Sequence, residues 1–100
     1  MRRPRQCIFS VVAEHDLEEI GDYIARDNPG RAVSFIHEIR EHCLKITAYP
    51  EAAPLRPKLG EGIRIVPFGR YLIFYTIHAD SVRVERIIHG ARNIPDLFNA

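Results

Sequence analysis

The repeat of apolar residues between Ala32 and Ile46 constrains the fold of this chain more than any other feature. Apolar side chains recur there at the spacing of one helix face, at Ala32, Ile36, Ile39, Cys43 and Ile46, which predicts an amphipathic helix. A shorter repeat of the same kind comes before it, at Ala13, Leu17, Ile20 and Ile24. In the connector between them, Asn28 suits a helix N-cap and Pro29 suits the first helical position. The sequence therefore predicts an antiparallel helical hairpin whose apolar faces need a surface to cover.

The segments on either side of this hairpin have the composition of β-strands. An apolar run from residue 6 to 12 predicts the first strand. After an irregular crossing from 50 to 62, which is rich in proline and glycine, three further runs follow at 63–66, 71–77 and 82–89. The element order β-α-α-β-β-β predicts an α+β fold of two layers, with the helical hairpin packed on a mostly antiparallel sheet. We expect a single domain over residues 1–100.

Two details of the predicted sheet bear on function. In the last run neither set of alternate residues is cleanly apolar, so we expect a β-bulge or a partly exposed face. The run from 71 to 77 is almost continuously apolar, as is typical of a central strand. An exposed sheet face containing Phe74 or Tyr75 would be a binding surface, and Gly69 is expected to supply a turn between two strands.

The charge balance argues against a protein that binds nucleic acid mainly through phosphates. Fourteen Lys and Arg residues oppose thirteen Asp and Glu residues, a net charge of +1, whereas such proteins carry a strong basic excess. No apolar run approaches the ~20 residues that span a bilayer, and the basic N-terminus precedes no apolar stretch typical of a signal peptide. We therefore expect a cytoplasmic protein with no direct nucleic-acid binding and no membrane association.

The sequence offers no recognisable metal or cofactor site. Cys7 and Cys43 fit neither a zinc spacing nor a disulfide framework, so we expect two reduced, buried thiols. His37 and His42 are five residues apart and do not share a helix face as an i,i+4 pair would. We expect no metal and no cofactor.

Two groups of charged residues could each form a functional site or be ordinary solvent-exposed side chains. Arg64, Arg86, His89 and Arg92 could stabilise phosphorane charge and transfer a proton in RNA cleavage. They could equally be ordinary surface residues, which the near-neutral charge favours. A stripe of Glu14, Glu18 and Asp22 on the first helix could dock a basic segment or be a solvated face.

Several stretches resemble, in order and spacing, the ParE branch of the RelE/ParE toxins, and together they extend from the first strand to Arg92. They are DLEEIGDYIA from Asp16, Asn28-Pro29, Phe35-Ile36, LGEGIR from Leu59, PFGRYLIFY from Pro67 and His89-Gly90-Ala91-Arg92. The resemblance implies the toxin of a type II toxin–antitoxin module of the kind that stabilises plasmids. ParE-type toxins inhibit DNA gyrase, whereas RelE-type relatives cleave ribosome-bound mRNA.

Two departures from the RelE pattern favour the ParE branch. The lysine-rich region of the ribosome-dependent enzymes is reduced to Arg56 and Lys58, and the tail after Arg92 lacks their basic or tyrosine-bearing end. One departure from the ParE pattern is Asn93, which stands where an aspartate commonly follows the arginine.

The resemblance also implies partners and site residues. We expect a non-enzymatic toxin, without catalytic residues, that binds gyrase through Arg64, Phe68, Arg70, His89 and Arg92. A ParD-like antitoxin is expected to form a hetero-oligomer with it along the helical hairpin, through Glu18, Asp22, Tyr23 and Phe35. The alternatives are a RelE-type endoribonuclease, with His89, Arg64, Arg86 and Arg92 as catalytic residues, and a binding module without toxic activity.

Overall fold

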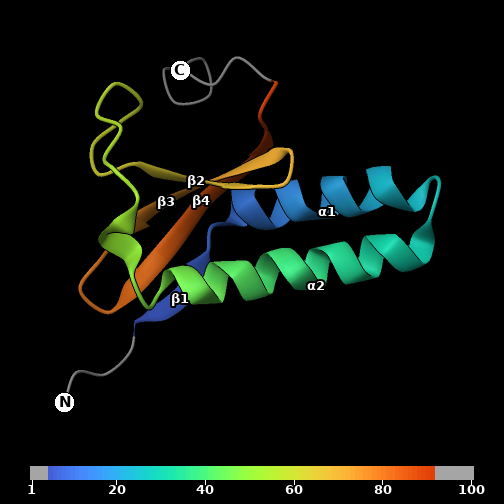
Figure 1. The fold of residues 1–100 in the computed structure, drawn as a ribbon, viewed down its shortest axis with the longest axis horizontal. Coiled ribbons are helices and arrows are strands. Elements are labelled where there is room, and N and C mark those ends of the chain that lie inside the picture. The colour runs from blue at the N-terminus through green and yellow to red at the C-terminus, as the bar shows by residue number, and fades with distance from the viewer. Residues whose placement is uncertain (1–4, 92–100) are drawn as a thin grey trace.

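The elements follow one another in the predicted order (Figure 1) in the computed structural model, which describes residues 5–91. They are β1 (Gln6–Phe9), α1 (Val11–Ala25), α2 (Pro29–Ile46), a 3-10 turn η1 (Pro50–Ala52), β2 (Arg64–Phe68), β3 (Tyr71–Ile77) and β4 (Ser81–His89). No helix within residues 5–91 is long and apolar enough to cross a membrane.

The four strands form one sheet in the order β1-β4-β3-β2. β1 pairs with β4 in parallel, and the other two pairs are antiparallel. The two helices lie side by side against one face of the sheet (Figure 1). Their apolar stripes meet the sheet in a core that includes Leu17, Ile39, Ile73 and Val84. The predicted α+β fold, a helical hairpin on a mostly antiparallel sheet, is confirmed.

Hydrogen bonds at the helix ends explain where the helices begin. The Ser10 hydroxyl accepts from the Ala13 amide at 2.9 Å, so Ser10 is the N-cap of α1. The prediction of a strand as far as residue 12 was therefore wrong, because Val11 and Val12 already belong to the helix. The predicted cap of α2 is confirmed, since Asn28 Oδ1 accepts from the Arg31 amide at 3.0 Å.

The predicted β-bulge is present in β4. Phe74 lies opposite Arg86 and Tyr75 lies opposite Val84, which leaves Glu85 as the extra residue. The carbonyl of Glu85 accepts a hydrogen bond of 2.8 Å from the Ser10 hydroxyl. One serine side chain thus caps α1 and binds the bulge, which fixes the helix to the sheet.

Neither Phe74 nor Tyr75 lies on an exposed sheet face, so the expectation of a binding surface there was wrong. Tyr75 faces the helices, is 1% exposed, and donates its hydroxyl to the carbonyl of Pro50 at 2.6 Å. Phe74 faces the other way and is 0% exposed, because Leu59 of the crossing segment and Ile63, the residue before β2, pack on it. The crossing segment therefore covers part of the far face of the sheet.

The turn between β2 and β3 is tighter than the sequence predicted. Strand β2 continues through Pro67 and Phe68, so only Gly69 and Arg70 form the turn. Gly69 has φ +58°, a left-handed conformation that glycine adopts without steric cost. This hairpin projects Arg70 at one end of the sheet.

Candidate protein-binding surfaces

Arg86 is held inside the fold by a carboxylate of α1. Its Nε and one terminal nitrogen each donate to Asp16 at 2.9 Å, and the two side chains are 19% and 8% exposed. Asp16 Oδ2 also accepts from the Ile87 amide at 3.0 Å. The hydrogen bond with Asp16 raises the pKa of Arg86. This two-pronged ion pair joins α1 to β4 next to the bulge.

Sequence reasoning did not single out Asp16 as a functional or structural residue. A signal was present, because Asp16 stands within the apolar stripe of the first helix, between Ala13 and Ile20. A carboxylate in such a stripe must be paired when it is buried. Nothing in the sequence, however, indicates that the partner is Arg86, which lies 70 residues away.

Arg64 also binds the chain itself. One of its terminal nitrogens donates to the carbonyl of Ala53 and, at 3.4 Å, to that of Glu51. Its Nε is buried and has no hydrogen-bond partner within residues 5–91. Arg64 thus attaches the segment after η1 to strand β2. Because Arg64 and Arg86 bind different segments, the structure does not join them in one site.

Five ring side chains form a continuous row between α2 and the end of the sheet, which we call the aromatic row. Successive ring centroids lie 5.0, 5.6, 5.7 and 5.4 Å apart along the order His42, Phe68, Phe35, Tyr71 and His89. Strand register explains part of the row, since Tyr71 lies opposite Phe68 on β2 and opposite His89 on β4. Such tilted ring pairs stabilise a surface beyond the area that they bury.

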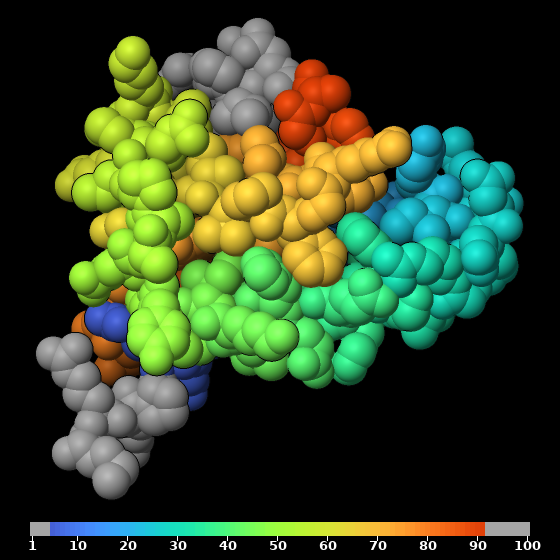
Figure 2. Space-filling view, in the orientation of Figure 1, coloured from blue at the N-terminus to red at the C-terminus, as the bar shows by residue number. Residues whose placement is uncertain are grey.

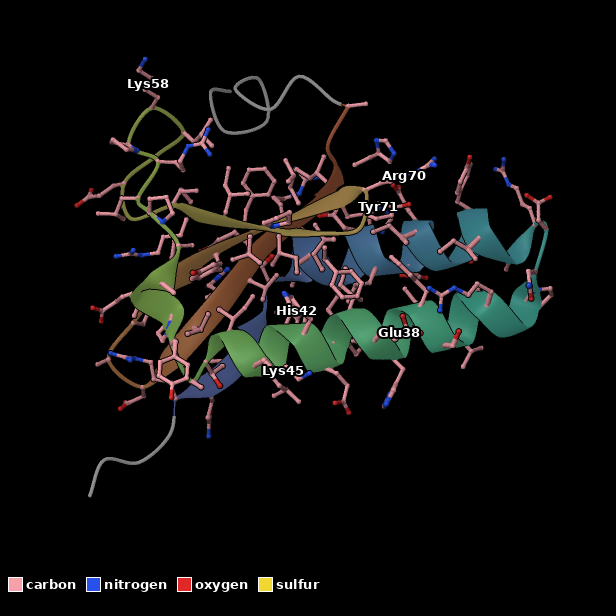
Figure 3. The ribbon with its side chains drawn as sticks, viewed as in Figure 1. Glu38, His42, Lys45, Lys58, Arg70 and Tyr71 are labelled. Carbon is pink, nitrogen blue, oxygen red and sulfur yellow. The ribbon has the colours of Figure 1, made fainter. Side chains whose placement is uncertain are left out.

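Arg70 stands at the exposed tip of the hairpin, beside this row (Figure 3). No hydrogen bond or ion pair of its side chain occurs among the described residues, although its carbonyl accepts from the Gly90 amide at 2.9 Å. His89 is exposed, and its Nδ1 accepts from the Ala91 amide at 3.2 Å. In the neutral ring the proton therefore lies on Nε2, which faces no partner among these residues.

The predicted target-binding residues are thus divided by the structure. Phe68, Arg70 and His89 come together around Tyr71, whereas Arg64 binds the segment after η1. Arg92 lies outside the described residues. Sequence reasoning missed Tyr71 and His42, although strand pairing and the helical repeat could have placed both beside Phe68.

A second surface is the groove between the two helices, which we call the hairpin groove. It has a volume of about 420 Å³ and an apolar floor that includes Leu17, Gly21 and Ile36. Its rim carries the three acidic residues of the predicted stripe, Glu14, Glu18 and Asp22, together with Arg40.

Only one of the three rim carboxylates is neutralised within the described residues. Arg40 donates two hydrogen bonds to Glu14, at 2.8 and 3.0 Å, and this pairing lowers the pKa of Glu14. Glu18 and Asp22 are exposed and form no ion pair in the part of the chain that the structure describes. The hairpin groove is therefore apolar at its floor and negative at its rim.

The other two residues expected to bind the antitoxin lie on a different side of the helices. Tyr23 is 66% exposed. The guanidinium of Arg26 lies over its ring, 5.9 Å from the centroid. Phe35 belongs to the aromatic row. Of the four predicted residues, only Glu18 and Asp22 thus line the hairpin groove.

Neither the acidic nor the sulfur-containing residues assemble into a metal centre in the described chain. Within residues 5–91 no group of three or more His, Cys, Asp or Glu side chains could hold a metal ion. Both cysteines are free, and burial raises the pKa of the Cys43 thiol to about 12. Cys43 is buried as expected, whereas Cys7 is only half-buried.

Comparison with known proteins agrees with this architecture. Residues 7–94 match the family described as the ParE toxin of type II toxin–antitoxin system, parDE. No curated protein matches the sequence significantly.

Two solved structures have a similar fold. One is from the chromosomal ParDE toxin–antitoxin system of P. aeruginosa, with 18% identity, a TM-score of 0.73, and coverage of 85% of this chain and 95% of that one. The other is from the RelBE2 toxin–antitoxin complex of Mycobacterium tuberculosis, with 23% identity, a TM-score of 0.65, and coverage of 87% and 99%. With the family match over most of its length, the chain belongs to the ParE toxins of type II toxin–antitoxin systems, within the RelE/ParE superfamily.

Proposed function

We propose that this toxin acts by binding DNA gyrase, without a chemical step of its own, and that a ParD-like antitoxin neutralises it. The observation that carries the proposal is the contrast between the arginines. Arg64 and Arg86, two of the candidate catalytic residues, bind the chain itself, whereas the guanidinium of Arg70 has no hydrogen bond or ion pair within residues 5–91 and lies beside the aromatic row.

The contacts of the candidate catalytic residues weigh against the endoribonuclease alternative. Arg86 would have to leave Asp16 to reach a phosphate, and a carboxylate buried without its partner costs several kcal/mol, on the order of 3–5. Arg64 donates to backbone carbonyls instead of facing solvent. The Nε2 atom of His89 has no hydrogen-bond partner among residues 5–91, but neither Arg64 nor Arg86 forms a hydrogen bond with His89, because each binds another segment. Within residues 5–91, Arg64 and Arg86 therefore do not form the concentrated cationic site that phosphoryl chemistry requires.

The exposed end of the sheet has the features of a protein-binding surface. Arginine and aromatic residues dominate the energetics of protein interfaces. Phe68 and Tyr71 are half-buried and held in the aromatic row, so they lose little conformational entropy on binding. Arg70 and His89 add exposed polar groups beside them. We assign the contact with gyrase to this end of the sheet.

The hairpin groove suits a neutralising partner of opposite charge. An extended antitoxin segment with apolar and basic side chains would fill the floor and pair with Glu18 and Asp22. The two similar solved structures come from toxin–antitoxin systems, which supports such a partner. A segment that orders on binding can wrap a long surface of this kind.

A supercoiling assay with purified toxin tests the gyrase proposal. We expect inhibition by the wild-type toxin and about tenfold or greater loss of inhibition for Arg70→Ala, the size of effect of an interface hot spot. Arg56→Ala, at an exposed position of the crossing segment, serves as the matched control. Full gyrase activity at a large excess of toxin would contradict the proposal. Cleavage of mRNA in a translating extract, lost in His89→Gln, would establish the endoribonuclease alternative.

The antitoxin proposal is tested separately by charge reversal. We expect the double variant Glu18→Lys/Asp22→Lys to bind its antitoxin at least about tenfold more weakly, because like charges would then meet across the interface. Glu61→Lys, in the exposed crossing segment, is the control. Unchanged affinity of the double variant in isothermal calorimetry would show that the stripe is only a solvated face.

A further inference from the structure

A third surface lies between α2 and the outer strand β2, and the functional assignments above do not use it. Two adjoining hollows, of about 480 and 180 Å³, share His42 and Lys45 as lining residues. We call them together the α2–β2 groove. Figure 3 shows His42 and Lys45 on the C-terminal half of α2, and Figure 2 shows the green atoms of that helix directly beneath the yellow atoms of the sheet.

The helix side of the groove is a single stripe of α2 and the residues after it. Glu38, His42 and Lys45 recur on α2 at intervals of three or four residues, so they lie along one face, and Tyr49 lines the smaller hollow beyond the end of the helix. Phe68 forms part of the opposite wall, and its ring lies 5.0 Å from that of His42. Phe68 is also a member of the aromatic row. The groove is therefore continuous with the surface that we assign to the target.

The groove carries one cation and two carboxylates. Glu38 is bound by Arg31 at 2.6 Å, and Glu41 lies 3.4 Å from the ring of His37. Lys45 is exposed and forms no hydrogen bond or ion pair within residues 5–91. An incoming carboxylate would therefore meet an ammonium group that no carboxylate binds within residues 5–91.

The smaller hollow is apolar and has the size of one side chain. Its lining includes Ile46, Ala53, Val66 and the ring of Tyr75, whose hydroxyl is already bound to the carbonyl of Pro50. A buried apolar cavity of about 150 Å³ holds a benzene ring, so the hollow of about 180 Å³ is large enough for a leucine or phenylalanine side chain. An apolar anchor here would lie next to the free ammonium of Lys45.

The neighbouring edge of the sheet does not favour strand addition. Pro67 lies within the outer strand β2 and has no backbone N–H to donate to an added strand. A partner that enters this groove would therefore be recognised through its side chains more than through its backbone.

We infer that the α2–β2 groove binds a segment of DNA gyrase that carries a leucine- or phenylalanine-sized side chain next to a carboxylate. The apolar side chain occupies the smaller hollow, and the carboxylate pairs with Lys45. This inference rests on the proposed function, because the groove shares Phe68 with the proposed target surface. The antitoxin, in contrast, is assigned to the hairpin groove, whose rim carries Glu18 and Asp22 without an ion pair among residues 5–91.

The experiment compares two groove variants with a matched surface variant in the full-length toxin. Lys45→Glu reverses the free charge, Ala52→Phe obstructs the smaller hollow from an exposed position, and Lys58→Glu reverses a charge in the crossing segment. Inhibition of supercoiling, gyrase binding by surface plasmon resonance and antitoxin affinity are measured for each. Circular dichroism and the melting temperature establish that each variant folds.

We expect both groove variants to inhibit and bind gyrase about tenfold more weakly, as when an anchor of an interface is lost. Lys58→Glu should stay within about twofold of the wild type, since isolated surface changes have small effects. Antitoxin affinity should be unchanged in all three. If the wild type inhibits gyrase and both folded groove variants inhibit it equally well, the inference is overturned while the proposed function stands.

Other occupants of the groove give different results. If the wild type neither binds nor inhibits gyrase, the proposed function itself fails. If the groove variants lose antitoxin affinity but still inhibit gyrase, the groove belongs to the antitoxin. If they instead convert a toxin dimer into a monomer in analytical ultracentrifugation and leave gyrase inhibition intact, a second copy of the chain occupies it. Each of the last two results overturns the assignment to gyrase.

Discussion

Strand β4 and the tip of the β2–β3 hairpin each carry an arginine, but the two arginines have opposite environments. Arg86 is held by a buried carboxylate and joins a helix to the sheet, whereas Arg70 projects from a two-residue turn with no partner among residues 5–91. Their charges are identical, so the neighbouring groups determine their roles. A guanidinium beside Asp16 contributes to stability, and a guanidinium beside an aromatic row is available to another macromolecule. This contrast can be tested by measuring stability and inhibition separately.

The largest effect on stability is expected for Asp16→Ala. The change leaves the charged and largely buried Arg86, whose side chain is 19% exposed, without its carboxylate, and it also removes the acceptor of the Ile87 amide. Breaking a buried pair in this way destabilises by about 3–5 kcal/mol. Urea unfolding followed by circular dichroism measures the change, with Glu18→Ala, at an exposed position of the same helix, as the control. A loss no greater than in the control would mean that Arg86 is not held in the interior.

The double variant Asp16→Leu/Arg86→Met refines this prediction. Replacing a buried ion pair by apolar residues of similar volume is often neutral or stabilising, because the cost of removing two charges from water disappears. We expect the double variant to recover most of the stability that Asp16→Ala loses, in the same urea titration. If it is as unstable as the single variant, the hydrogen bond to the Ile87 amide is the dominant contribution.

A smaller loss of stability is expected for Ser10→Ala. The change removes the N-cap of α1 and the hydrogen bond to the carbonyl of Glu85 in the bulge. Loss of a cap alone costs about 1 kcal/mol, up to about 2. Differential scanning calorimetry measures the lower melting temperature, with Ser34→Ala on the exposed face of α2 as the control. Equal melting temperatures of the two variants would contradict the dual role of Ser10.

A still smaller and pH-dependent effect is expected for Glu14→Gln. The hydrogen bond from Arg40 lowers the pKa of Glu14, so the pair stabilises the fold above pH 4.5, the ordinary pKa, and this contribution is lost as the pH falls through the lowered pKa. An exposed pair of this kind contributes only about 0.2–1 kcal/mol. Urea titrations should show a deficit of the variant at pH 7 that disappears at strongly acidic pH. A deficit that persists in acid would assign it to packing instead of charge.

The smallest effect on stability is expected for Arg70→Ala, although its effect on inhibition is expected to be large. An exposed side chain without a partner changes the free energy of unfolding by no more than about 0.5 kcal/mol. Unfolding measurements on the protein used in the supercoiling assay provide the comparison. A marked loss of stability would mean that the variant fails to inhibit because it is less folded, and the contrast with Arg86 would no longer hold.

Features that depend on neighbouring residues in the chain could be predicted from the sequence. The apolar repeats gave both helices, Asn28 and Pro29 marked the start of α2, and Gly69 marked the turn that projects Arg70. The first helix began earlier than expected, because Ser10 is a cap. Its hydroxyl binds both the Ala13 amide and the bulge, and only the first of these contacts is local.

Features that depend on distant segments could not be predicted. The burial of Phe74 follows from the crossing segment that packs over it, and no local pattern reveals that packing. Arg86 forms its ion pair with Asp16 of α1, and Arg64 donates a hydrogen bond to the carbonyl of Ala53 after η1. The aromatic row combines residues of one helix with residues of three strands. Alternation within each strand indicates a face, but it does not identify the ring that will lie opposite.

The parallel pairing of β1 with β4 has a consequence for synthesis. Gln6 lies opposite Ser81, so the first described strand cannot find its neighbour until residues 81–89 have left the ribosome. β4 also lies between β1 and the β2–β3 hairpin, so without β4 the strand β1 has no pairing partner in the sheet. Pairing between residues so far apart in sequence forms slowly, because the long loop must close first. The four-stranded sheet is therefore completed only after the last described strand has been synthesised.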